Sequence, residues 1–243
     1  MHSMPRLMAG IATLALMSAT TADAGELQVE RTGYALQAEQ QGEGPMIVVF
    51  ESGFGQGGGV WKDVVADLGA QCRCITYARA GLGKSGTDGK PKTMAEDVQN
   101  LGAVIDTVAP NEKVLLVGHS YGGAVITEAG DQPNVVGLVY IAAFAPDAGE
   151  SPGGITQANP PVAAANLAPD SDGYLWVKQD KFHESFCQDL SVDDALVMAV
   201  TQKAPLAGTF GDTITAPAWK KKPCGYQIST DDRMIAPANQ EMM

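Results

Sequence analysis

The sequence has 243 residues, 45% of them hydrophobic, and a formal net charge of −12 at pH 7. This length can build one sizeable core but little more than one domain, so we expect a single domain with an insertion. The excess of acidic residues repels phosphate groups and anionic lipids, which argues against nucleic acids and membrane surfaces as partners.

The first 24 residues have the pattern of a secretory signal peptide. Arg6 gives a short positive end, residues 7–19 form an apolar run, and Ala22-Asp23-Ala24 is a small-residue cleavage site. The run is shorter than the roughly 20 residues that a spanning helix needs, although an uncleaved anchor is the alternative. We therefore expect an exported protein, periplasmic or secreted, whose mature domain covers residues 25–243.

Short runs rich in β-branched and apolar residues recur along the chain, at residues 46–52, 72–78, 113–119 and 135–143. Continuous apolar runs of this length are typical of strands that are buried on both faces of a parallel sheet. A further strand is predicted at residues 224–230, after a long interval.

A helix is predicted between the second and third of these strands. Thr93 and Glu96 have the spacing of a capping box, and apolar residues then recur every three or four positions until Pro110. Strands that alternate with helices favour an α/β fold, in which helices cover both faces of a parallel sheet.

Residues 146–217 differ in composition from the rest of the chain. They begin with segments rich in Pro, Gly and Ala, and become helical in character around residues 174–186 and 192–204. Because a structureless loop of this length is uncommon in a compact domain, we predict a small inserted cap of helices.

Glycine-rich segments at residues 53–58 and 81–86 match the dinucleotide-binding pattern G-x-G-x-x-G. Neither opens directly into a helix with an acidic residue about 20 positions further on, so we expect no nucleotide cofactor. The second segment also resembles a phosphate-binding loop, but Ala78 stands where the first glycine is required. Four cysteines and three histidines without a zinc-ligand spacing predict no metal site.

The segment Gly118-His119-Ser120-Tyr121-Gly122 follows a predicted strand and precedes a helical stretch. A nucleophile elbow needs this layout, because its serine sits in a strained turn and the flanking glycines let the backbones pass closely. The turn exposes the serine Oγ, and the following helix directs its first amides at a developing oxyanion. Ser120 is therefore the candidate nucleophile, with a tight packing turn as the alternative.

With this elbow the chain resembles the α/β-hydrolase superfamily over essentially its whole mature length. The resemblance rests on VVFESGFG, YARAGLGKSG, GHSYGGA and LVYIAAFAPDAGES. The last of these, with TAPAWKKKPCGYQISTDDRMIAP, is similar to small-cap esterases that include plant methylesterases and hydroxynitrile lyases. The resemblance implies an α/β-hydrolase fold and hydrolysis of a small-molecule carboxylic ester through an acyl-enzyme, without a cofactor or metal.

The resemblance also implies roles for individual residues. Ser120 is the nucleophile, and the backbone amide of Tyr121 forms half of the oxyanion hole. The other half is the amide of Phe54, in a loop where family members usually carry His-Gly and this chain has Ser52-Gly53. The acid is Asp232, with Asp231 as the fallback and a cap of the helix near Pro237 as the alternative role.

None of the three histidines fits the place that the family reserves for the general base. His2 lies in the predicted signal peptide, and strand alternation is expected to send the ring of His119 away from the Ser120 Oγ. His183 lies in the predicted cap, with no evident path to Asp232.

The family pattern places the base well beyond the acid and after one more strand, whereas eleven residues follow Asp232. We therefore expect a C-terminal truncation that removes the histidine together with the last strand and helix, and leaves this chain inactive as given. The alternative is a complete, non-catalytic ligand-binding homologue. A cofactor-free lyase or haloperoxidase on the same fold is a further alternative.

Trp176, Phe182, Phe186 and Leu190 are expected to line an apolar pocket under the cap, or equally to form the core of the cap. Export permits disulfides, and Cys187 with Cys224 is the first pairing to test, with free thiols as the alternative. The sequence leaves the oligomeric state open.

Overall fold

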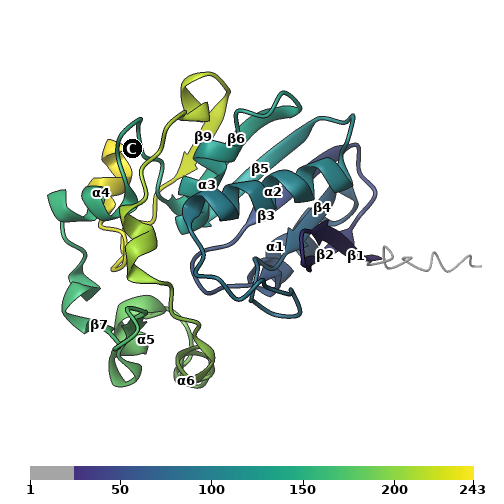
Figure 1. The fold of residues 1–243 in the computed structure, drawn as a ribbon. Helices are drawn as coiled ribbons and strands as arrows, with labels where there is room; N and C mark the ends of the chain where they lie inside the picture. Colours follow the sequence, from purple (N-terminus) through teal and green to yellow (C-terminus); the bar gives the residue numbers. More distant parts are fainter. Residues whose placement is uncertain (1–24) are drawn as a thin grey trace, which may run out of the picture.

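The computed structural model describes residues 25–243, so the predicted signal peptide lies outside the described residues. Within them, a seven-stranded sheet has the order β1-β2-β4-β3-β5-β6-β9 (Figure 1). The strands β4, β3, β5, β6 and β9 are parallel to one another, whereas β2 pairs in an antiparallel manner with both β1 and β4. The strand bounds are β1 (Gly25–Arg31), β2 (Tyr34–Gln41), β3 (Met46–Glu51), β4 (Cys72–Tyr77), β5 (Val114–Ser120), β6 (Val135–Ala143) and β9 (Cys224–Gln227).

All five strands predicted from apolar runs are present. Strand β6 has the predicted bounds, while β9 ends at Gln227, three residues earlier than expected. The hairpin of β1 and β2 is additional to the predicted strands. Its residues are partly exposed and include several charges, so it lacks the continuous apolar run that marks the buried strands.

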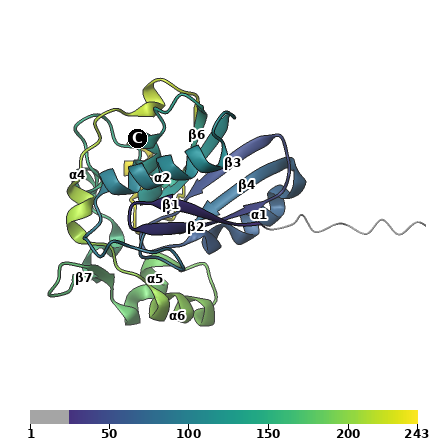
Figure 2. The same cartoon turned by 45° about the vertical axis from the view of Figure 1, so that its right-hand side comes forward.

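Helices cover both faces of the sheet, as the turn of the view between Figures 1 and 2 shows. Along β3, Ile47 and Val49 pack into the core beneath α2 (Met94–Val108) and α3 (Tyr121–Ala129). Val48 and Phe50 point the other way, into a smaller core with Trp61 of the 3-10 helix η1 (Gly58–Trp61) and with α1 (Lys62–Leu68). This alternation explains why the strand is apolar from Met46 to Phe50.

The predicted capping box begins α2 as expected. The Thr93 side chain accepts a hydrogen bond from the Glu96 amide at 3.3 Å, and the Thr93 amide donates to Glu96 Oε2 at 3.1 Å. The reciprocal pair fixes where this helix starts.

The segment between β6 and β9 forms the predicted cap, but part of it is not helical. It contains α4 (Pro152–Ala158), the small hairpin of β7 (Leu167–Pro169) and β8 (Leu175–Val177), α5 (Phe182–Phe186) and α6 (Val192–Thr201). The hairpin stands where a helix was predicted from residue 174 onward. Asp170 sets its turn, because Asp170 Oδ1 accepts from the amides of Asp172 and Tyr174 at 3.0 and 2.9 Å.

The last helix, α7 (Pro237–Met242), begins at Pro237, where it was expected. No helix among residues 25–243 is long and apolar enough to cross a membrane. The four cysteines, all within the described part, are free thiols, with Cys187 buried in the cap and Cys224 exposed on β9. Of the two possibilities left open for Cys187 and Cys224, the structure has the free thiols.

Candidate active site

Ser120 lies at the junction of β5 and α3 in a backbone conformation that side chains rarely adopt, with φ 54° and ψ −125°. The flanking glycines are required by space. A Cβ on Gly118 would lie 2.8 Å from the carbonyl oxygen of Gly122, and a Cβ on Gly122 would overlap the carbonyl oxygen of Glu51. The strained turn at Ser120 therefore has the geometry that a nucleophile elbow requires.

The loop after β3 lies beside the elbow and places Phe54 in the wall of the same cavity as Ser120. The Phe54 ring stacks on the Tyr121 ring, with 3.7 Å between centroids and 19° between planes. Ser52, which stands in place of the family histidine, has its own anchor: Trp61 Nε1 donates to Ser52 Oγ at 3.0 Å, and Ser52 Oγ donates to the Gly57 carbonyl at 3.3 Å.

The peptide that carries the Tyr121 amide is fixed from its other side. The Phe144 amide, directly after β6, donates to the Ser120 carbonyl at 3.0 Å. Because the C=O and N–H of a trans peptide point in opposite directions, this bond sets the direction of the Tyr121 N–H. The amide that opens α3 is thereby available to bind a negatively charged oxygen.

His119 is among the residues that line the cavity beside Ser120. The register between β5 and β6 shifts at this point because β6 has an extra residue, Ala142, between the partners of His119 and Ser120. The His119 Nδ1 lies 3.2 Å from Gln56 Oε1, and the ring stands edge-on to Trp61. Burial lowers the pKa of His119 to about 4, so the ring is neutral at pH 7 and a weak base.

His183 lies in α5 and takes no part in the cavity wall. Its Nε2 hydrogen-bonds the carbonyl oxygen of Leu190 at 3.0 Å, within the cap. Among residues 25–243, therefore, neither histidine hydrogen-bonds Ser120 or Asp232.

Asp232 lies in the loop between β9 and α7, behind the cavity wall formed by Met234 and Ile235. Its Oδ1 accepts from the amides of these two residues at 2.8 and 2.9 Å, and its Oδ2 accepts from Gln240 Nε2 at 2.8 Å. Burial raises the pKa of Asp232, and the three hydrogen bonds oppose that rise. Asp232 does not cap α7, since Ala236 is the N-cap of that helix.

The fallback acid, Asp231, is exposed, and its carbonyl oxygen accepts a hydrogen bond from Gln188 Nε2 at 3.0 Å. Of the two neighbouring carboxylates, Asp232 is the half-buried one, and its carboxylate is held by its own loop next to the cavity-lining Met234 and Ile235.

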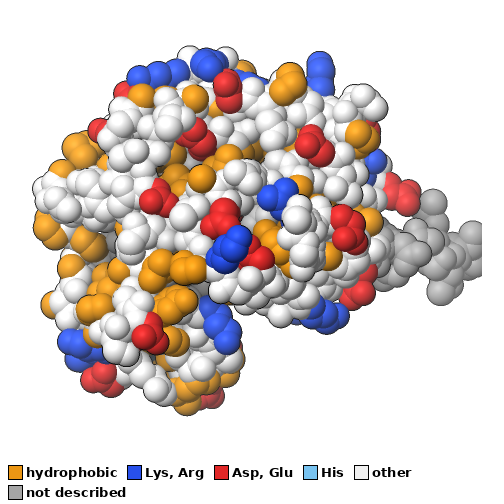
Figure 3. Space-filling model, in the orientation of Figure 1, with side chains coloured by type: hydrophobic (Ala, Val, Ile, Leu, Met, Phe, Trp, Pro, Cys, Tyr) orange, Lys and Arg blue, Asp and Glu red, His pale blue; other side chains and the backbone are white. Residues whose placement is uncertain are grey.

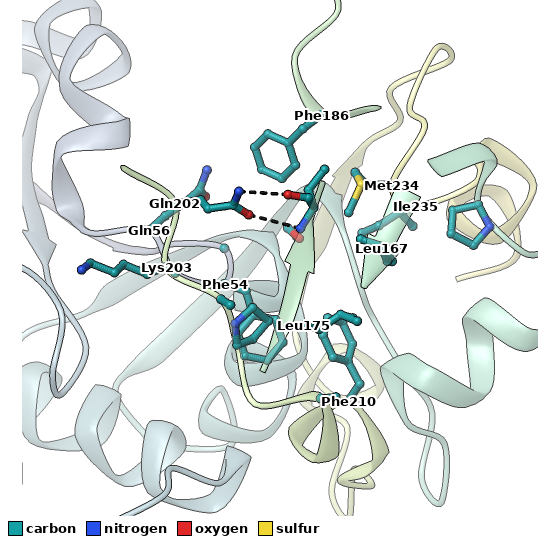
Figure 4. A pocket seen from close by; sticks show the side chains of 18 of the residues that line it. Phe54, Gln56, Leu167, Leu175, Phe186, Gln202, Lys203, Phe210, Met234 and Ile235 are labelled. Carbon is teal, nitrogen blue, oxygen red and sulfur yellow. Dashed lines mark hydrogen bonds between the residues drawn. The ribbon is translucent and has the colours of Figure 1, made fainter. Parts of the chain in front are cut away.

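The cavity has a volume of about 700 Å³ and lies between the sheet and the cap. Figure 4 shows Phe54, Leu167, Leu175, Phe210, Met234 and Ile235 around it. In Figure 3 hydrophobic side chains gather where the lobe of α5 and α6 meets the rest of the molecule. Lys203 is the one charged side chain among the described residues that line the cavity. The site therefore suits an uncharged, largely apolar ligand.

The cap contributes fewer of the expected residues than the sequence suggested. Phe182 and Phe186 line the cavity, whereas Trp176 and Leu190 are 37% and 43% exposed and do not. Gln56, Phe144 and Phe210 line it without having been predicted. Phe144 had a usable signal, since it directly follows a parallel strand, and ligands bind at the carboxyl ends of such strands.

Comparison with known proteins places the chain among hydrolases. A family model described as the alpha/beta hydrolase family matches residues 48–243. Probable hydrolase R7 of Phoma sp. is 28% identical over 153 residues, which are 61% of this chain and 62% of that protein. The carbendazim hydrolyzing esterase of Nocardioides sp. is 35% identical over 107 residues, which are 42% of this chain and 44% of that protein. The chain thus spans less than two thirds of these relatives.

A solved structure supports the fold itself. The methylesterase protein MES16 from Arabidopsis superposes with a TM-score of 0.63 at 21% identity, over 81% of this chain and 83% of that one. At this identity the likeness establishes the fold alone. Together with the family model, which spans most of the described residues, it assigns the family. The chain belongs to the alpha/beta hydrolase family.

Proposed function

We propose that the cavity around Ser120 is the active site of a serine hydrolase that acts on carboxylic esters. One observation carries this proposal: the strained backbone of Ser120 at a strand–helix junction, with its side chain in the cavity wall beside Phe54. Such strain costs on the order of 1–3 kcal/mol and clusters at active sites, where it is part of the mechanism.

In this mechanism Ser120 Oγ attacks the carbonyl carbon of the ester, and the Oγ proton passes to a base. The carbonyl oxygen becomes an oxyanion that the amides of Phe54 and Tyr121 hold. Collapse of the intermediate breaks the bond to the alcohol, which takes up the proton and leaves Ser120 acylated. Water then attacks the acyl carbon, and the acid departs.

The base is the part of the mechanism that the described histidines do not provide. His119 is bound to Gln56, and His183 is bound to Leu190. The family resemblance implies a histidine oriented by Asp232, whose Oδ2 here accepts from Gln240. We propose that turnover needs a histidine base that His119 and His183 do not supply in this arrangement, and that without a base turnover falls by about 10⁶-fold.

The walls of the cavity support an uncharged ester of small or medium size as the substrate. The lining is mostly apolar, and Lys203 brings the one charge among the described lining residues. The esterase names among the relatives favour the same substrate class. The net charge of −12 argues against nucleic acid or anionic lipid as a partner, and the pattern of residues 1–24 supports export.

Non-catalytic ligand binding is the second candidate function. It is favoured by one observation, that all polar atoms of the Asp232 carboxylate are already bound within its own loop and by Gln240. A protein of this kind would hold an ester or acid in the cavity without cleaving it.

Imidazole added to the solution separates these two functions, because it can enter the cavity and act as the missing base. We expect this chain to hydrolyse 4-nitrophenyl butyrate slowly, and to respond to imidazole more than the Ser120→Ala variant does. The variant measures hydrolysis by imidazole alone. Equal rates for the two proteins at every imidazole concentration would contradict the hydrolase and leave ligand binding.

A further inference from the structure

A buried cluster of charged and phenolic side chains lies behind the nucleophile. Arg79, the second residue after β4, is 5% exposed, and Glu51 at the end of β3 is fully buried. Arg79 Nη1 donates to Glu51 Oε1, and Arg79 Nε lies 3.9 Å from Asp97 Oδ2 of α2. Tyr77 also donates to Glu51, and Tyr121 donates to Asp97 at 3.1 Å. The proposed mechanism uses none of these side-chain groups.

The guanidinium of Arg79 also reaches the loop that carries the first oxyanion donor. Arg79 Nη1 donates to the carbonyl oxygen of Ser52 at 2.6 Å, and Nη2 donates to that of Gly53 at 2.5 Å. The Gly53 carbonyl and the Phe54 N–H belong to one planar peptide, in which they point in opposite directions. A bond that holds the carbonyl against Arg79 therefore turns the Phe54 N–H away from Arg79.

The second donor is fixed by the same geometry, since the Phe144 amide holds the Ser120 carbonyl and thereby the Tyr121 N–H. The two donors differ in what holds them. Regular backbone next to β6 fixes the Tyr121 peptide, whereas the Gly53 carbonyl of the Phe54 peptide accepts from the Arg79 side chain at 2.5 Å and from the Gln56 amide at 3.3 Å. The first oxyanion donor is thus the one that a side-chain substitution can loosen.

We infer that Arg79 is a positioning residue for the oxyanion hole, an inference that rests on the function proposed above. It acts through the Gly53–Phe54 peptide and does not touch the substrate. Its own place is set by Glu51, which accepts from Nη1, and by Asp97, whose Oδ2 lies 3.9 Å from Nε. The Arg79 guanidinium also lies 5.4 Å from the centroid of the Tyr121 ring, next to the second donor.

An arginine suits this position better than a lysine. Its planar fork serves Glu51, Ser52 and Gly53 at once, whereas a lysine presents one point charge. Burial alone lowers the pKa of Arg79, but Glu51 and Asp97 outweigh it and hold the pKa above its ordinary value. The Arg79 guanidinium therefore stays positively charged in the protein interior, where water does not compete for its hydrogen bonds to the loop.

Phenylboronic acid tests this inference, because its boron bonds to a serine Oγ and places an oxygen in the oxyanion hole. We expect Arg79→Met to weaken phenylboronic acid binding by about tenfold to a hundredfold, given that loss of one oxyanion donor costs about 10²–10³ in rate. Arg79→Lys should recover part of the affinity. Benzyl alcohol, which fills the cavity without an oxyanion, should bind all of these proteins alike.

Arg73→Met is the matched control, since Arg73 is on β4 and pairs with Glu112 at 2.6 Å, away from the loop. It should leave both affinities unchanged. Arg79→Met leaves the buried Glu51 carboxylate without its ion-pair partner. If the variant fails to fold for that reason, the double variant Glu51→Gln/Arg79→Met, which also removes this carboxylate, is compared with Glu51→Gln alone. Hydrogen exchange at the Phe54 amide should be faster wherever Met replaces Arg79.

The outcomes separate the two proposals. Equal phenylboronic acid binding by the wild-type chain and Ser120→Ala would overturn the proposed function. Loss of binding in Ser120→Ala, with wild-type affinity and wild-type exchange at Phe54 in Arg79→Met, would overturn the role of Arg79 alone. Equal losses for phenylboronic acid and benzyl alcohol in Arg79→Met would show general damage to the cavity and would also overturn that role.

Discussion

The ring of Phe54 lies flat on the ring of Tyr121, with 3.7 Å between their centroids. These two residues carry the backbone amides proposed as the oxyanion hole, so the stack ties the loop after β3 to the first residue of α3. Phe210 of the cap region extends the contact, with its centroid 4.6 Å from that of Phe54. Side-chain packing thus holds in register two amides that come from different elements.

Phe54→Ala should weaken both the fold and the site. The loss of a half-buried ring and its stack is expected to lower the free energy of unfolding by about 2 kcal/mol. Phenylboronic acid affinity should fall as well, because the loop loses its contact with Tyr121. Urea denaturation and titration of the ligand measure the two effects. Phe54→Leu, which keeps apolar volume, should show smaller losses, and equal losses would argue against the stack.

Gly122→Ala should destabilise the chain strongly, since its Cβ would overlap the Glu51 carbonyl oxygen. Overpacking of this kind costs about 1–3 kcal/mol, and here the neighbour is backbone that cannot rotate away. Gly225→Ala on β9 is the control, because a Cβ there has no atom within 4 Å. Thermal unfolding of the two variants should separate them clearly. Similar melting temperatures would mean that the elbow is less tightly packed than described.

His119 should remain neutral down to pH values near 4. Burial lowers its pKa from 6.5 to about 4, so the unfolded chain takes up a proton before the folded chain does. The contribution of His119 to the free energy of unfolding, roughly 3 kcal/mol, is therefore complete above pH 6.5 and is lost as the pH falls through about 4. An NMR titration of the imidazole measures the pKa directly. A midpoint near 6.5 would contradict the buried placement.

Glu51 should give stability the opposite dependence on pH. Burial raises its pKa from 4.5 to about 7, so the folded chain holds a proton that the unfolded chain releases. This contribution is complete below pH 4.5 and is lost as pH rises through about 7. The difference in unfolding free energy between wild type and Glu51→Gln should change over this window. A difference that is constant between pH 4.5 and 7.5 would show that Glu51 titrates normally.

Much of the framework could be predicted from the sequence, because local patterns carry it. Buried parallel strands have continuous apolar runs, as residues 46–50 show, and the capping box of Thr93 and Glu96 needs only neighbouring residues. The elbow at Ser120 was also readable, since its glycines and its place between strand and helix are local features.

The rest depends on contacts between distant residues. In the sequence, Arg79 stands beside the glycine-rich segment at residues 81–86, which resembles a phosphate-binding loop. Its inferred role depends on Glu51 and Asp97, which come from separate elements. The contacts of the His119 ring with Gln56 and Trp61 likewise join separate segments, which local strand alternation does not predict. The hairpin of β7 and β8 forms because Asp170 stabilises a turn at residues 170–174, although residues 174–186 have the composition of a helix.

The central claim is that Ser120 is a nucleophile. It is tested most directly by treating the chain with 4-nitrophenyl acetate in imidazole buffer and mapping the acetyl group by peptide mass spectrometry. We predict acetylation of Ser120 in the wild-type chain, at a rate that rises with imidazole, and none at this peptide in Ser120→Ala. Acetyl groups only on lysines, with the Ser120 peptide unmodified, would contradict it.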